Sequence, residues 1–275
     1  MKKKNGRFTT VILVIVLLAG LSLLLYPTVS NYWNSLHQTK AIATYSESVA
    51  AISDEEYARL WNNARNFNSR IPERSNVYVM NDSEQEEYES LLNVDGSGVM
   101  GYVEIPEIDV MLPIYHGTSE AVLQVAVGHL EWTSLPVGGV GTHCVLSGHR
   151  GLPSAKLFTN LDKLETGDTF TLNILDDVLT YEVDQILIVL PSETSALQIV
   201  ENEDYCTLVT CTPYGINTHR LLVRGHRIET EKEAPVLRVT SEALQIDTKL
   251  VALTVALPIL LFLLIVLLIG TRKRR

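Results

Sequence analysis

The sequence predicts a mainly β domain, a closed barrel or a largely antiparallel sheet, flanked by two membrane-spanning helices. Short runs of strand-forming residues recur after about residue 98 at spacings of about 8–12 residues, which is typical of barrels and sandwiches. Two apolar stretches, residues 8–26 and 250–270, lie near the two ends of the 275-residue chain. Each is close to the ~20 residues that cross a bilayer core. We therefore expect the β domain at residues 98–230.

The charges beside the two apolar stretches predict the orientation. Residues 1–7 carry four basic side chains and residues 271–275 carry four more, and neither tail has an acid. Basic flanks stay in the cytoplasm, so both tails are assigned there and the middle of the chain outside. A cleaved signal peptide is the alternative for residues 8–26. That stretch exceeds the usual ~7–15 apolar residues of a signal peptide, and no small-residue cleavage site follows it directly.

The exported part is strongly acidic. The tails hold 8 of the 22 basic residues and none of the 32 acids, so the remainder carries 14 − 32 = −18. A domain with this charge is a poor partner for nucleic acid or for anionic lipid.

Residues 27–97 are expected to form a helical extension with a covering segment. Few helix breakers occur in residues 31–49, and Ser53-Asp54-Glu55-Glu56 reads as a capping box that opens a helix over residues 54–67. The polar faces of these helices predict loose packing on the domain. Residues 71–93 are polar and acidic without a strand period, which fits either a loop or a lid.

The barrel elements follow in order. The expected strands are residues 99–105, 108–114, 142–147, 169–174, 179–189, 205–210 and 220–224. Short helices are expected at residues 120–127 and 155–164, a Gly/Pro-rich loop at 132–141 and a helical turn at 192–197. Residues 231–249 then connect the domain to the second span.

Three cysteines, Cys144, Cys206 and Cys211, leave at least one free thiol. Cys206 and Cys211 are five residues apart in one strand-like run, so they point to opposite faces of the sheet. The sequence allows a disulfide between Cys144 and Cys206. Cys211 ends its strand just before the turn that holds Pro213 and Gly215, which makes it the candidate nucleophile.

A thiol needs a base or a positive neighbour to react as thiolate. His149 follows a strand end and lies between two glycines, and strand alternation from His143 places it on the face opposite Cys144. His143 and His219 are the alternatives. Arg220 opens the second strand of the hairpin and cannot lose its proton, so it could serve as a fixed donor to an oxyanion. An ordinary surface arginine at a strand end is the other reading.

Several motifs resemble one family. Thr-Leu-Val-Thr-Cys at residues 207–211, with Arg220 nine positions later, resembles the sortase signature Thr-Leu-x-Thr-Cys. Residues 147–151, followed by residues 155–164, are similar to the histidine segment of that family. Residues 212–225, together with the two anchors and the N-terminal extension, are similar to the class C, pilus-assembling branch.

This resemblance implies a sortase-type closed β-barrel with short helices. Cys211 would attack the Thr–Gly bond of a Leu-Pro-x-Thr-Gly-like (LPXTG-like) sorting signal, with His149 as acid/base partner and Arg220 as the stabilising donor. A thioacyl enzyme would pass the acyl group to a pilin lysine, with no cofactor, so pilin subunits and the membrane are the expected partners. Anchoring of surface proteins to peptidoglycan is one alternative. A non-enzymatic receptor or scaffold, in which Cys211 would be buried and inert, is another.

The lid is where the chain departs from the family pattern. Class C enzymes often carry an Asp-Pro-aromatic motif that plugs the site. Here Asp82 is followed by Ser83, and the nearest rings are Tyr78 and Tyr88. A lid would therefore need other anchors, and these three residues are its candidates. The sequence gives no indication of the oligomeric state.

Overall fold

The structure is a computed structural model that describes residues 5–73 and 79–230, with side chains from residue 12 onward except Glu73. The second expected span, residues 250–270, and the connector before it lie outside the described residues. So do Tyr78 and the basic C-terminal tail.

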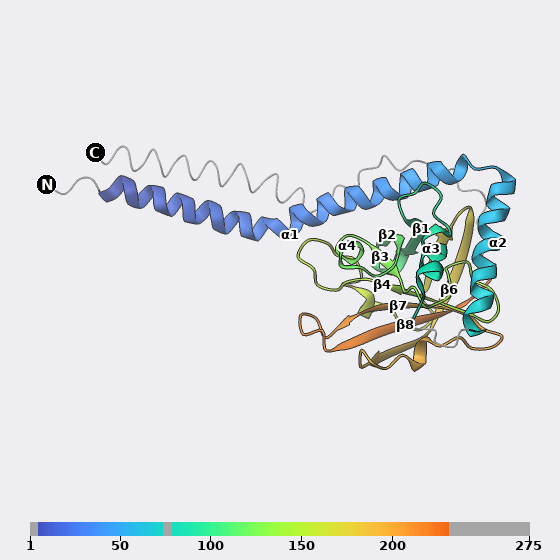
Figure 1. Ribbon diagram of the computed structural model, residues 1–275. Coiled ribbons are helices and arrows are strands. Elements are labelled where there is room, and N and C mark those ends of the chain that lie inside the picture. Colours follow the sequence, from blue (N-terminus) through green and yellow to red (C-terminus); the bar gives the residue numbers. More distant parts are fainter. Residues whose placement is uncertain (1–4, 74–78, 231–275) are drawn as a thin grey trace. The chain divides into compact units, whose positions relative to one another are not determined.

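Eight strands close into a barrel in the order β1-β2-β3-β4-β7-β8-β6-β5, which confirms the expected fold class (Figure 1). Two of the neighbouring pairs, β2 with β3 and β4 with β7, are parallel, and the others are antiparallel. The strands are β1 (Val99–Ile105), β2 (Val110–His116), β3 (Val127–His129), β4 (Thr142–Ser147), β5 (Thr169–Ile174), β6 (Asp177–Val189), β7 (Asp204–Thr212) and β8 (His219–Arg227).

In the described residues three α-helices precede the barrel: α1 (Asn5–Ala50), α2 (Asp54–Arg70) and α3 (Asp82–Ser90). The first is one continuous helix that contains Pro27, where the sequence suggested a span and a separate helix. Its apolar part is long enough to cross a membrane. Helix α3 was not expected. It carries the full reciprocal capping box, in which Asn81 and Glu84 each accept from the other's backbone N–H.

The box predicted at Ser53 is only half formed. The Ser53 hydroxyl accepts from the Glu56 N–H at 3.2 Å, as expected for an N-cap. The Glu56 carboxylate instead accepts from Arg59 Nε at 2.9 Å, one turn along the helix.

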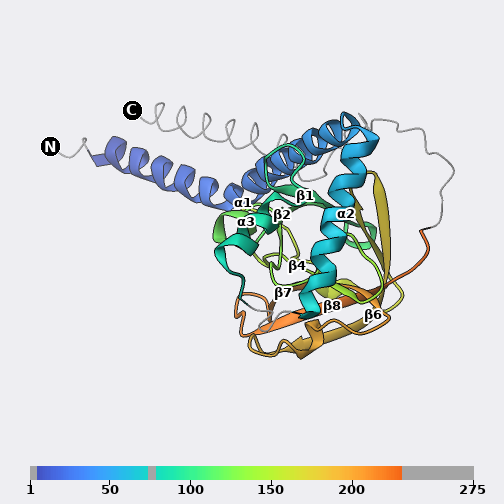
Figure 2. The ribbon, with the colours of Figure 1, turned by 45° about the vertical axis from the view of Figure 1, so that its right-hand side comes forward.

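The extension packs tightly on the barrel, so the expectation of loose packing was wrong. Tyr45, Phe67 and Tyr88 are at most 1% exposed. The Tyr45 hydroxyl donates to the Met100 carbonyl and accepts from the Leu175 N–H, each at 2.8 Å. Figure 2 shows α2 crossing one side of the barrel. Burying each such aromatic side chain contributes about 1.5–3 kcal/mol.

Two expected short helices differ from the structure. Residues 120–127 form only a brief helix α4 (Glu120–Leu123) and then enter β3. Residues 155–164 form turns and one 3₁₀ turn, η3 (Leu161–Lys163). Leu157 has a φ of +39°, which a right-handed helix excludes, and Phe158 next to it is fully buried.

Strand β7 separates two apolar clusters. Cys206 and Leu208 point into the main core, whereas Val209 belongs to a smaller cluster on the outer face with Val145 and Leu222. Cys211 lies on the same outer face as Val209 because side chains alternate along a strand. It is half-buried, while Cys144 and Cys206 are buried free thiols opposite each other on β4 and β7.

Candidate active site

The β7–β8 hairpin places a thiol opposite a guanidinium. Cys211 and Arg220 are register partners in the antiparallel pair, where opposed Cβ atoms lie about 4.5–5.5 Å apart. Both side chains therefore leave the sheet from the same face. Arg220 Nη1 donates to the carbonyls of Asn217 and His219 at 3.3 and 3.2 Å, which fixes the guanidinium at the turn.

The parallel pair β4–β7 brings His149 to the same level. Ser147, the last residue of β4, is the register partner of Val209, and His149 follows Ser147 by two residues as Cys211 follows Val209. The Gly148 N–H donates to the Val209 carbonyl at 3.0 Å, and the Thr210 hydroxyl donates to the Gly148 carbonyl at 2.7 Å. Backbone contacts on both sides of Gly148 thus position the histidine against β7.

The His149 ring keeps a free nitrogen. Its Nε2 is buried and has no hydrogen-bond partner in the part of the chain that the structure describes. The His149 carbonyl accepts from the Phe158 N–H at 3.1 Å, so the backbone is held while the ring nitrogen stays available. A buried polar atom without a partner is uncommon and is often found at functional sites.

Arg150, to which the sequence alone assigns no role, links the histidine segment to the cysteine strand. Its side chain is one-tenth exposed, and its guanidinium pairs with Asp162 at 2.5 Å. Nη1 also donates to the Thr212 hydroxyl at 3.4 Å, directly after Cys211. Only the pairing of β4 with β7 brings these residues together, so no local signal marked Arg150 in advance.

The outer apolar cluster continues the face on which Cys211 lies. Val209 is two residues before Cys211, and Leu222 is two residues after Arg220. Leu197, from the segment between β6 and β7, packs on them. The cluster is buried, so it stiffens the sheet on the face that carries the thiol. Strand parity could have placed Val209 and Leu222 here, but it could not have predicted that Leu197 covers them.

The alternative histidines are placed differently. His143 Nδ1 contacts the Gln198 carbonyl at 2.8 Å, and Nε2 contacts the Thr207 hydroxyl at 2.7 Å. Burial lowers the pKa of His143, so the neutral ring is favoured. His143 thus links the β6–β7 segment to the barrel. His219 is opposite Thr212 in register and contacts its neighbour Thr218.

A second histidine–cysteine neighbourhood lies inside the barrel. His129 is fully buried, and its Nδ1 contacts the Tyr88 hydroxyl at 2.9 Å while Nε2 contacts the Ser134 carbonyl at 2.8 Å. Cys144, on the neighbouring strand β4, is only 2% exposed. A peptide substrate cannot reach this thiol, which leaves Cys211 as the accessible one.

Of the lid candidates, Asp82 and Tyr88 lie in the described residues, and their surroundings differ. Asp82 begins α3, is exposed and lies in the first turn of the helix. Tyr88, near the end of α3, is fully buried, and its hydroxyl also accepts from the Gly117 N–H at 3.0 Å. Tyr88 therefore fastens α3 to the barrel.

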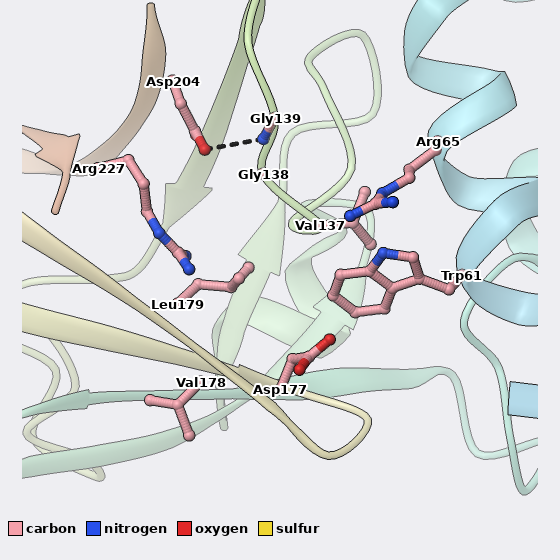
Figure 3. Close-up of a pocket in the computed structure, with 10 residues that line it drawn as sticks. All are labelled: Trp61, Arg65, Val137, Gly138, Gly139, Asp177, Val178, Leu179, Asp204 and Arg227. Carbon is pink, nitrogen blue, oxygen red and sulfur yellow. Dashed lines mark hydrogen bonds between the residues drawn. The ribbon is translucent and has the colours of Figure 1, made fainter. Parts of the chain in front are cut away.

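A cavity of about 230 Å³ lies at the opposite end of the hairpin (Figure 3). Asp204 opens β7 and Arg227 closes β8, seven residues from Cys211 and Arg220 respectively, or about 23 Å at ~3.3 Å per residue. Asp204 accepts from the Gly139 N–H at 2.8 Å, the dashed line in Figure 3. The cavity is therefore remote from the thiol, and the candidate active site is the turn end of the hairpin.

Comparisons with known proteins agree on one family. A family model described as the sortase domain matches residues 103–228. The solved structure of sortase C1 from Streptococcus agalactiae is 50% identical, covers 70% of this chain and 100% of that chain, and superposes with a TM-score of 0.68.

Two further relatives extend this likeness. Sortase C from Clostridium perfringens, solved with the C-terminal cell wall sorting motif, is 46% identical, covers 70% of this chain and 100% of that chain, and has a TM-score of 0.62. Sortase A from Listeria monocytogenes is 27% identical over 80% of this chain and 92% of its own length.

Proposed function

The chain belongs to the sortase family, in its class C branch, and on this basis we propose that it polymerises pilin subunits. As a cysteine transpeptidase, it would cleave an LPXTG-like sorting signal between Thr and Gly and join the new carboxyl end to a pilin lysine. The proposal rests on one observation above all. Cys211 and Arg220 are register partners at the turn end of the hairpin, with the segment of His149 bonded to the same strand.

Acylation begins with the Cys211 thiolate. Its sulfur attacks the threonine carbonyl carbon, and the carbonyl oxygen becomes an oxyanion. The Arg220 guanidinium, directly opposite the thiol, donates hydrogen bonds to this oxyanion without being able to release a proton. His149, protonated on its free ring nitrogen, passes that proton to the glycine amine as the C–N bond breaks. A thioester on Cys211 and a free N-terminal glycine result.

Transfer reverses the roles. A neutral amine attacks the thioester carbonyl, and His149 takes its proton. Arg220 again stabilises the oxyanion, and the Cys211 thiolate leaves as the amide bond forms. Water in place of the amine gives slow hydrolysis.

The outer apolar cluster supports binding of the signal. Leu197 buries Val209 and Leu222 on the face of the sheet that carries Cys211, so this packing would hold β7 and β8 in place behind a peptide bound at the thiol. Arg150 would act as a positioning residue, since it bridges the segment of His149 and the residue after Cys211.

The acceptor separates the two candidate activities of this family. A pilin lysine as acceptor gives pilus polymers, and a peptidoglycan cross-bridge amine gives wall-anchored protein. The solved structure of sortase C from Streptococcus pneumoniae, 46% identical, is described as giving insights into pilin substrate specificity, which favours the first. We place the catalytic domain outside the cell, with both termini in the cytoplasm and a second span at residues 250–270.

The acceptor experiment uses the full-length protein in detergent. Enzyme and an LPXTG-bearing peptide are mixed with a lysine-containing pilin domain, with the same domain in which each lysine is arginine, or with a cross-bridge peptide. The proposal expects an amide-linked product with the lysine-containing domain alone. Products formed only with the cross-bridge peptide would assign the chain to wall anchoring instead.

A further inference from the structure

Beyond its apolar part, helix α1 has one face docked on the barrel. Asn34 Nδ2 donates to the Ser154 carbonyl at 2.8 Å, and the Lys156 N–H donates to Asn31 Oδ1 at 2.8 Å. One turn further on, Gln38 Nε2 donates to the Val125 carbonyl at 2.6 Å. The residues on this face that follow, Ile42, Tyr45 and Val49, are buried.

The opposite face of the same turns is apolar and exposed. At 100° per residue, four side chains lie on the far side of the helix from Asn34 and Tyr45. This patch consists of Val29, Tyr32, Trp33 and Leu36, which are 55%, 48%, 63% and 48% exposed. Lys40 follows the patch on the same side. A large apolar surface that stays exposed among the described residues marks an interaction site.

The position of the patch along the helix points to a lipid surface. Val29 to Leu36 lie 3 to 10 residues past Tyr26, where the expected span ends, which is about 5–15 Å along the helix. The polar layer of a bilayer is only about 5–8 Å thick on each side. If α1 followed the membrane normal, Trp33 and Leu36 would lie beyond that layer.

Pro27 resolves this mismatch. Proline inside a helix removes a backbone hydrogen bond and bends the axis. It lies between the expected span and the patch, and Figure 1 shows α1 changing direction part-way along. An inclined helix brings the whole patch into the layer that tyrosine and tryptophan prefer at membrane interfaces.

We propose that Val29, Tyr32, Trp33 and Leu36 are embedded in the headgroup layer of the membrane, with the barrel held on the opposite face of α1. The inference rests on the proposed membrane anchoring. The exported part of the chain carries an excess of acids, so apolar contact and not attraction to anionic headgroups holds this surface.

This arrangement fixes the height of the active site. Asn31 and Asn34 bind the backbone of residues 154–156, in the same connection that begins with His149. A patch embedded in the interface therefore keeps the catalytic segment within a few helical turns of the lipid. The substrate it suits is a peptide whose scissile bond lies just outside the membrane that anchors it.

Trp33 provides a native probe. The full-length protein and its Trp33→Phe variant are reconstituted in phosphatidylcholine vesicles, and the difference between their emission isolates Trp33 from Trp61 and Trp132. We expect lipids brominated near the headgroup to quench this component by at least half, and aqueous iodide to leave it nearly unchanged. Flotation with the vesicles reports anchoring separately.

Two serine variants supply the comparison. Val29→Ser/Leu36→Ser should at least halve the lipid quenching of Trp33, whereas Val140→Ser, at a 76% exposed position in the loop before β4, should leave it unchanged. Protein that floats while iodide alone quenches Trp33 would overturn the proposal and leave anchoring intact. Shielding of Trp33 from both quenchers that is lost on dilution would also overturn the proposal, because a second copy would then cover the patch. The same holds if removal of residues 250–275 abolishes the shielding, because the chain's own C-terminal segment would then cover it. Protein that does not float would overturn the anchoring itself.

Discussion

Replacement of Thr210 by valine tests how β7 positions the histidine. Thr210 is 2% exposed, and its hydroxyl donates to the carbonyl of Gly148, the residue before His149. Valine has nearly the same shape but no donor. The substitution therefore leaves a buried carbonyl without this partner and changes little else.

The expected cost follows from that loss. A buried acceptor left unsatisfied costs about 1–3 kcal/mol. In a domain of this size, 1 kcal/mol corresponds to about 2–4 °C, so Tm should fall by about 2–12 °C. Release of the Gly148 carbonyl also frees the histidine segment. Since a shift of about 1 Å in a catalytic group can cost up to ~100-fold, we expect kcat to fall by about 10- to 100-fold while KM changes little.

The assay is cleavage of a fluorogenic LPXTG-like peptide at a temperature where all variants remain folded. Thr210→Ser keeps the donor and loses one methyl, so it should lose stability but retain most of kcat. Thr169→Val, on the exposed first residue of β5, controls for valine substitution in a strand. Wild-type kcat in Thr210→Val, or equal losses in Thr210→Ser, would show that this hydrogen bond does not position the histidine.

Three further predictions concern the barrel. Tyr88→Phe should lower the free energy of unfolding by about 1–3 kcal/mol because His129 loses its hydroxyl partner, and an unchanged urea midpoint would contradict this. Gly225→Ala should cost about 1–3 kcal/mol in a thermal melt, since the new Cβ would lie 2.8 Å from the Phe170 ring; a wild-type Tm would count against that packing. Burial raises the pKa of Asp204 above its ordinary 3.8, so the folded state binds this proton more tightly than the unfolded state. The contribution of Asp204 to wild-type stability should therefore fall as pH rises through this raised pKa. The difference in free energy of unfolding between wild type and Asp204→Asn should shrink in urea titrations from pH 4 to 7, and a constant difference would exclude the raised pKa.

Local patterns predicted most of the barrel. Strands β4 and β5 have the predicted bounds because alternating or continuous β-branched runs there end at clear turn signals. Strand β3 escaped prediction because its three residues are too few to show alternation, and its parallel pairing with β2 depends on the fold. Helix α3 was not predicted because its acidic sequence has few apolar residues, and Tyr88 is its one buried residue.

The sequence predicts those features of the candidate site that depend on residues close together in the chain. Cys211 and Arg220 belong to one hairpin, so the turn between them predicts their opposition. His149 followed from strand parity within its own segment. Arg150 and Leu197 could not be assigned because their contacts depend on bringing β4 beside β7 and on folding the β6–β7 segment over the outer face.

The proposed acyl-enzyme on Cys211 can be sought directly by intact-mass and peptide-mapping spectrometry of the enzyme quenched in acid during incubation with an LPXTG-like peptide. We predict an added acyl peptide ending at threonine, attached to Cys211 as a thioester that hydroxylamine removes, and no adduct in Cys211→Ala. We also expect His149→Ala and Arg220→Ala to accumulate far less of the adduct while remaining folded. Peptide cleavage that persists in Cys211→Ala, or an acyl group mapped to another residue, would contradict the proposed mechanism.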